Sequence, residues 1–263
     1  MEDYLNKTRE ANLDGTGAKP VSSFTNKTYV KVFLYFGLAL LITTAVTFGA
    51  SSLIYNLAIN NPEIGIMAYY IFLGVGIVGL FICSLIVSFF CNKKGRGLIV
   101  PYVLYAVFMG FILTGVCFTV DSPYVFGTAL GFTALIFLIT CGIGALLGDK
   151  IKFVYLVLIY GLSAIGFMCL FNFVLLPFIF MNSSVAINAF NALLWGIEII
   201  YFVVIIAYIA IDMSRLKAIA NSSNGVITTN LALYCALNLF SDFIILFLRI
   251  LYIVAMSSGK RKR

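Results

Sequence analysis

Two aspartates, Asp212 and Asp242, lie inside or at the edge of the last two strongly apolar segments of the chain. A carboxylate is costly to place where water is scarce, so an ionisable residue inside such a segment is a functional-site hypothesis by default. Two close carboxylates in a low-dielectric environment cannot both ionise cheaply, so they exchange protons as a unit. When deprotonated, they offer hard oxygen ligands that suit a divalent cation such as calcium. The predicted chemistry is therefore competition between protons and a cation.

The two aspartates can meet only if their segments fold as neighbouring helices. With the sixth apolar segment helical to about residue 220 and the seventh beginning near 229, Asp212 lies about 12 Å and Asp242 about 20 Å from the connected ends. Helix tilt can absorb this difference, so we expect a carboxylate pair in the cytoplasmic half. A scaffold alternative stays open, because Asp242 and Arg249 are seven residues apart, nearly on one helix face, and could belong to an ionic network that only holds helices together.

Glu198 is a third acidic residue inside an apolar segment. It precedes Asp212 by fourteen residues, so the two side chains lie near one face of the same helix, about 21 Å apart along its axis. This spacing allows Glu198 to line the same ion pathway as the aspartates, to stay protonated by itself, or to form an ion pair with Arg249. The sequence leaves these interpretations open.

The elements that position these residues follow from the composition. Of the 263 residues, 62% are hydrophobic and 10% are charged, and the mean hydropathy is +1.09, whereas a soluble domain carries about 25% charged residues. Seven apolar runs, each longer than about 20 residues and without alternating polarity, favour transmembrane helices over barrel strands. We predict an all-α polytopic membrane protein, a seven-helix bundle with the last helix near its centre. The runs are residues 30–57, 64–90, 98–120, 125–147, 153–180, 186–211 and 231–256.

Polar stretches divide the chain and set its orientation. Residues 1–28 are predicted to be a disordered cytoplasmic tail, residues 29–257 the transmembrane domain and residues 258–263 a basic C-terminal tail. Lysines and arginines gather before or at the start of the first span and in the second, fourth and sixth connections, which places the N-terminus in the cytoplasm by the positive-inside rule. Seven full crossings put the C-terminal cations outside. We expect a complete last crossing, with a bend and re-entry at Asp242 as the alternative.

Several kinds of chemistry are excluded by the residue content. The chain contains no histidine, which removes the commonest general base and the usual zinc ligand. Its six cysteines lie singly, without any Cys-x-x-Cys pair, and no glycine-rich phosphate loop follows a strand. The cations behind the net charge of +7 follow membrane topology rather than a nucleic-acid-binding pattern. We therefore expect no enzyme activity, no cofactor and no nucleic-acid partner.

The stretches around the two aspartates resemble the transmembrane Bax inhibitor motif family, of the Bax inhibitor-1 type. The resemblance implies a seven-helix membrane protein that leaks calcium in a pH-sensitive manner. Asp212 and Asp242 would then be its pH-sensing carboxylates and its transient calcium ligands. The similar stretches are Asp212 to Lys217, residues 242–247 (Asp-Phe-Ile-Ile-Leu-Phe), and residues 28–32 together with Thr43-Thr44 in the first helix.

The resemblance also implies a residue that holds the closed state, and this chain departs from the family pattern at some positions. In some bacterial members a basic residue at the cytoplasmic end of the second helix latches the closed state, and the nearest counterparts here are Asn92 and Lys93. The usual tyrosine before the first aspartate is Ile211, and Ser241 replaces an aliphatic residue before the second. The hydrogen bonds of the carboxylates are therefore expected to differ from the family pattern.

Three functions compete on these observations. The first is a calcium leak channel gated by protonation of Asp212 and Asp242, with calcium as the permeant ion and the lipid bilayer as its surroundings. The second is a proton-coupled transporter that uses the same acids. The third is a non-enzymatic regulator of membrane-protein quality control or stress response, with a membrane protein such as a protease as its partner. The length and the absence of a targeting peptide fit a bacterial cell membrane, although an endoplasmic reticulum protein would look similar.

Overall fold

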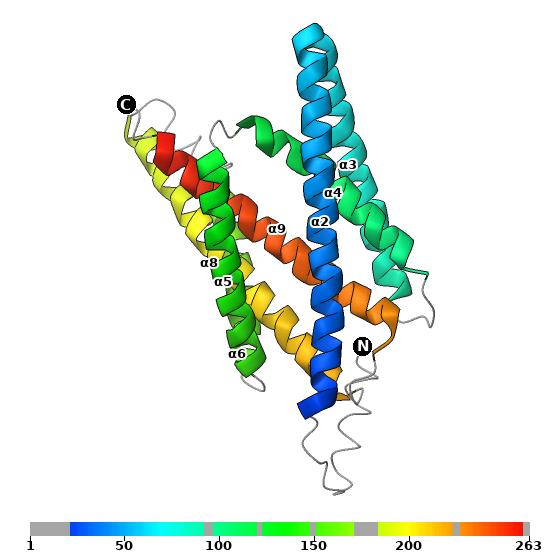
Figure 1. Ribbon diagram of the computed structural model, residues 1–263. Helices are drawn as coiled ribbons and strands as arrows, with labels where there is room; N and C mark the ends of the chain where they lie inside the picture. Colours follow the sequence, from blue (N-terminus) through cyan, green and yellow to red (C-terminus); the bar gives the residue numbers. More distant parts are fainter. Residues whose placement is uncertain are drawn as a thin grey trace, which may run out of the picture. The chain divides into compact units, whose positions relative to one another are not determined.

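The computed structural model describes residues 22–91, 97–119, 123–147, 151–170, 184–222 and 227–259, and every regular element within them is an α-helix. Within these described residues seven helices follow one another, the number predicted (Figure 1). They are α2 (Ser22–Asn60), α3 (Pro62–Phe90), α4 (Ile99–Thr119), α5 (Pro123–Leu147), α6 (Ile151–Leu170), α8 (Ser184–Ser222) and α9 (Thr229–Gly259).

Six of the described helices are long and apolar enough to cross a membrane, which makes the chain a multi-pass membrane protein. The exception is α6, whose apolar stretch Val154–Gly166 is shorter. The predicted fifth run continued to residue 180, but residues 171–180 lie outside the described part of the chain. The seventh crossing therefore stays a prediction.

The start of one helix differs from the sequence expectation, and the continuity of another decides between two alternatives. The helix α2 begins at Ser22, seven residues before the predicted start of the transmembrane domain, and Thr28 within this extension is buried. The helix α9 runs without interruption from Thr229 to Gly259. The alternative of a bend at Asp242 was therefore wrong, because the aspartate lies within a continuous helix. The central position of α9 stays a prediction, although 61% of its most apolar window is buried, compared with 22–39% in the other spans.

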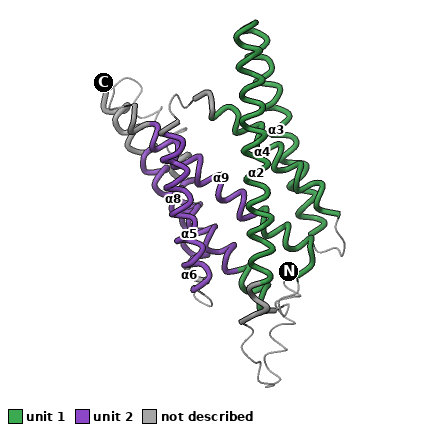
Figure 2. Tube along the Cα trace, in the orientation of Figure 1, with its two compact units in different colours: residues 1–116, 215–237 green, residues 117–214, 238–263 purple. Residues whose placement is uncertain are grey.

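The chain divides into two compact units, residues 1–116 with 215–237 and residues 117–214 with 238–263 (Figure 2). In unit 1, α2 and α3 form a hairpin around Asn61 and Pro62. Asn61 has an extended backbone (φ −153°, ψ 102°), Pro62 occupies the first turn of α3, and the Asn61 amide donates to the Leu57 carbonyl at 2.8 Å. A Cβ on Gly65 would lie 2.6 Å from Cβ of Ala58, so only glycine allows the two helices to approach this closely.

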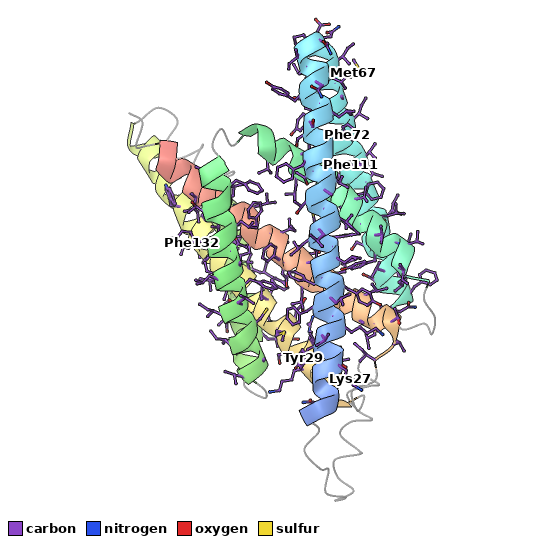
Figure 3. All side chains as sticks on the ribbon, viewed as in Figure 1. Lys27, Tyr29, Met67, Phe72, Phe111 and Phe132 are labelled. Atoms are coloured by element: carbon purple, nitrogen blue, oxygen red, sulfur yellow. The ribbon has the colours of Figure 1, made fainter. Side chains whose placement is uncertain are left out.

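Unit 1 continues with α4, which contacts both helices of the hairpin. Thr43 and Thr47 of α2 donate their hydroxyl hydrogens to the carbonyls of Ala106 (2.8 Å) and Gly110 (3.1 Å) on α4. Such hydrogen bonds between helices replace the water that the bilayer lacks. The ring of Phe72 on α3 lies beside the ring of Phe111 on α4, with the two centroids 4.9 Å apart (Figure 3).

The helix α3 contributes a narrow, mostly small-residue face to unit 1. Its buried residues are Gly65, Gly76, Gly79, Cys83 and Val87. A Cβ on Gly79 would lie 2.5 Å from the ring of Phe108, and one on Gly76 would lie 2.9 Å from Ile112. Large apolar side chains such as Met67, Ile77 and Phe81 are exposed instead, as expected for residues that meet lipid tails.

Unit 2 contains α5, α6 and the adjoining parts of α8 and α9. Two aromatic pairs join α5 to α9, namely Phe126 with Phe247 (5.2 Å between centroids) and Phe137 with Phe243 (5.3 Å). The helix α6 meets α8 where a Cβ on Gly161 would lie 2.5 Å from Val204. In this unit α8 and α9 run antiparallel, as the order of colours along the two helices shows (Figure 1).

Candidate functional site

Glu198 on α8 and Arg249 on α9 form an ion pair within unit 2. Nη1 of Arg249 donates to both carboxylate oxygens of Glu198, at 2.7 Å to Oε1 and 2.6 Å to Oε2. Tyr201, one turn along α8 from Glu198, places its ring centroid 4.1 Å from Cζ of the guanidinium. One face of α8 therefore offers both a carboxylate and an aromatic ring to Arg249. Of the interpretations that the sequence left open for Glu198, the ion pair with Arg249 is the one observed.

This cluster is enclosed on most sides. The side chains of Arg249 and Glu198 are 32% and 26% exposed. An arginine costs about 2.5–3.5 kcal/mol at the centre of a transmembrane helix and less near its end, and Arg249 lies six residues before the end of the apolar span at Ala255. A charge-assisted hydrogen bond to a carboxylate and a cation–π contact offset that cost. The ion pair is thus the reason that α9 can carry Arg249 through an apolar segment.

The ion pair also shows which faces of α8 and α9 meet. Fourteen residues separate Glu198 from Asp212, about 40° short of four full turns, and seven separate Asp242 from Arg249, about 20° short of two. The faces that meet at the ion pair are therefore nearly the faces that bear the two aspartates. We call the line defined by Glu198, Asp212, Asp242 and Arg249 the α8–α9 seam.

The helix α5 contacts both helices close to the aspartates. The ring of Phe137 packs against Phe243, the residue after Asp242, with 5.3 Å between centroids. Seven residues later, a Cβ on Gly144 would lie 2.6 Å from the carbonyl oxygen of Ala210, two residues before Asp212. These contacts are about 10 Å apart along α5. The aspartate-bearing parts of α8 and α9 thus meet two successive turns of a third helix.

The two aspartates are half-buried. Oδ2 of Asp242 is enclosed and accepts no hydrogen bond from the described residues. In the same described part of the chain, no group of three or more histidine, cysteine, aspartate or glutamate side chains could hold a metal ion. Calcium binds about six to eight oxygen atoms. Two carboxylates supply at most four of them, so a cation at this site would keep much of its water.

Some predicted site residues are not described by the structure, and some observed contacts were not predicted. Asn92 and Lys93, the candidate latch residues, lie outside the described part of the chain. Sequence reasoning missed Tyr201, for which the available signal was its spacing of three residues from Glu198. It also missed the contact in unit 1 between Nζ of Lys31 and Oγ1 of Thr229, at 3.2 Å.

Comparison with known proteins supports the resemblance seen in the sequence. The model of the family Bax1-I, described as inhibitor of apoptosis-promoting Bax1, matches residues 25–259. This range includes all seven helices except the first three residues of α2. No curated protein matches the chain. With a family match over most of its length, the chain belongs to the Bax1-I family of transmembrane proteins.

Proposed function

We propose that the protein is a calcium-permeable leak channel in which protonation of Asp212 and Asp242 controls the passage of the ion, with the N-terminus on the cytoplasmic side. The observation that carries this proposal is the α8–α9 seam. Because Glu198 and Arg249 are in contact at 2.6 Å, the nearly aligned Asp212 and Asp242 belong to facing sides of the two helices. Contacts of α5 with both helices, through Phe137 and Gly144, support the same arrangement.

The seam also gives the scale of the interaction between the aspartates. If Glu198 and Arg249 are level, Asp212 and Asp242 differ by about seven residues in depth, which is about 10 Å along the antiparallel helices. At that distance and an effective dielectric constant of about 20, two negative charges repel by about 1.7 kcal/mol. A cation between them relieves this repulsion, and a proton on either carboxylate removes it.

The spacing also constrains how calcium would be held. Calcium–oxygen bonds measure about 2.3–2.6 Å, so carboxylates offset by about 10 Å cannot both bind one ion directly without movement of the helices. The cation would therefore be held partly through water and pass from one carboxylate to the other. Such weak, successive binding suits a leak, because an ion must also leave each site.

The test is calcium flux into vesicles reconstituted with the purified protein, measured across a pH series. We expect flux to fall as the pH is lowered, because protonated carboxylates attract the cation less. Asp242→Asn should reduce both the flux and its dependence on pH. Glu63→Gln is the matched control, since Glu63 lies in the first turn of α3 in unit 1. Equal flux in the parent protein and Asp242→Asn at every pH would refute the proposal.

The same vesicles separate the channel from the other two functions. Flux that saturates with a solute and follows an imposed proton gradient would indicate a proton-coupled transporter. Absence of any flux, together with a co-purified membrane protein that is retained by an Asp212→Asn, Asp242→Asn double variant, would indicate a regulator of other membrane proteins.

A further inference from the structure

We infer that Glu198 and Arg249 are positioning residues that fix the axial register of α8 against α9 and thereby set the spacing of Asp212 and Asp242. The importance of that spacing rests on the proposed function, whereas the register itself is a property of the helix pair. The ion pair therefore has a role beyond neutralising a charged residue in an apolar segment.

Apolar helix faces define a register only weakly in a bilayer. Lipid tails are as apolar as the side chains between the helices, so association depends on close packing and on polar contacts. On the face of α8 that bears Glu198, the buried residues Ile205 and Ile209 are apolar. Packing of this kind distinguishes poorly between registers that differ by one turn, whereas a charged contact at 2.6 Å has no equivalent one turn away.

The geometry of the cluster is more restrictive than charge neutralisation requires. Arg249 contacts Glu198 and Tyr201 together, which are three residues apart on α8. A slip of one turn, about 5.4 Å, in either direction would separate the guanidinium from at least one of them. A single long-range attraction would tolerate such a slip, but this double contact does not.

The consequence reaches the aspartates because all four residues belong to two continuous helices. A slip by one turn would change the axial offset of Asp212 and Asp242 from about 10 Å to about 5 or 15 Å. Either change alters how a cation is shared between them. The register contact and the proposed ion site are thus coupled through the rigidity of α8 and α9.

The test measures the register directly by electron paramagnetic resonance. In a full-length protein with its native cysteines replaced, spin labels are attached at Val203→Cys on α8 and Ile245→Cys on α9, which are 46% and 38% exposed and lie outside the seam. Asp212 and Asp242 stay intact, so calcium flux can be measured on the same samples. Distances are recorded in lipid vesicles.

Glu198→Gln and Arg249→Gln should each shift the main distance, or add a second one that reflects a slip of about 5 Å. The charge-swapped protein, Glu198→Arg with Arg249→Glu, should restore the parental distance, which also covers the case in which a single variant fails to fold. Ile199→Gln is the matched control, because this neighbour of Glu198 is 63% exposed and should leave the distance unchanged.

The outcomes distinguish this inference from the proposed function. Unchanged distances in both single variants would overturn it, and so would a charge-swapped protein that resembles the single variants. A shifted distance with unchanged calcium flux would support the register role and count against the aspartates as the ion site. A shifted distance with altered flux, both restored by the charge swap, would support the two together.

Discussion

Replacement of Gly144 by alanine tests whether α5 holds the seam. A Cβ at this position would lie 2.6 Å from the carbonyl oxygen and 2.9 Å from Cα of Ala210, and both atoms are backbone. Ordinary contact begins at 3.4 Å, so α5 and α8 must move apart by roughly 0.8 Å. Overpacking of this kind costs about 1–3 kcal/mol. We therefore expect Gly144→Ala to lower the unfolding temperature by several degrees.

Gly131→Ala provides the control for this change. Gly131 lies on the same helix with no described atom within 4 Å of its Cβ position. Both substitutions gain the same helix propensity, up to about 1 kcal/mol, so the difference between them isolates the clash with Ala210. Thermal unfolding of the two variants in the same lipid–detergent mixture gives that difference. Equal unfolding temperatures would refute the close contact of α5 with α8.

Four further results are expected. Asp212→Asn should flatten the pH dependence of calcium flux as Asp242→Asn does, measured in the same vesicles. Arg249→Gln should destabilise the fold by less than the roughly 3–5 kcal/mol of a fully buried pair, because it leaves a partly exposed Glu198 carboxylate uncompensated, and the charge-swapped protein should recover most of that loss in thermal unfolding. Thr43→Val should cost about 0.6–2 kcal/mol, the value of one hydrogen bond between membrane helices, in the same assay. Lys31→Met should cost less than about 1.5 kcal/mol, since one hydrogen bond to Thr229 is lost.

The sequence predicted the helices well and their contacts poorly. The length of each apolar run indicates a membrane helix, because the bilayer leaves few other structures possible. The start of α2 was missed because residues 22–28 contain no apolar run, although they continue the helix. The polar Asp242 also allowed a break in the last helix. The continuous backbone of α9 shows that the helix is not broken there.

The site illustrates the same limit at the level of single residues. Spacing placed Arg249 within reach of either Asp242 or Glu198, since both arrangements satisfy helix periodicity, and the structure identifies the Glu198 contact. Gly131 and Gly144 could not be told apart by residue type, although one faces open space and the other faces a backbone carbonyl. Tyr201 could not be singled out among the 15 tyrosines of the chain.

The narrow buried face of α3 has a consequence for how this chain can vary. Only Gly65, Gly76, Gly79, Cys83 and Val87 of that helix are enclosed by protein. A library of all single substitutions in α3 should therefore show a sparse pattern of intolerant sites, with the glycines accepting almost nothing larger. At the other positions of α3, any apolar side chain should be tolerated. Natural selection on this helix would thus conserve these few buried positions and allow apolar substitutions at the others.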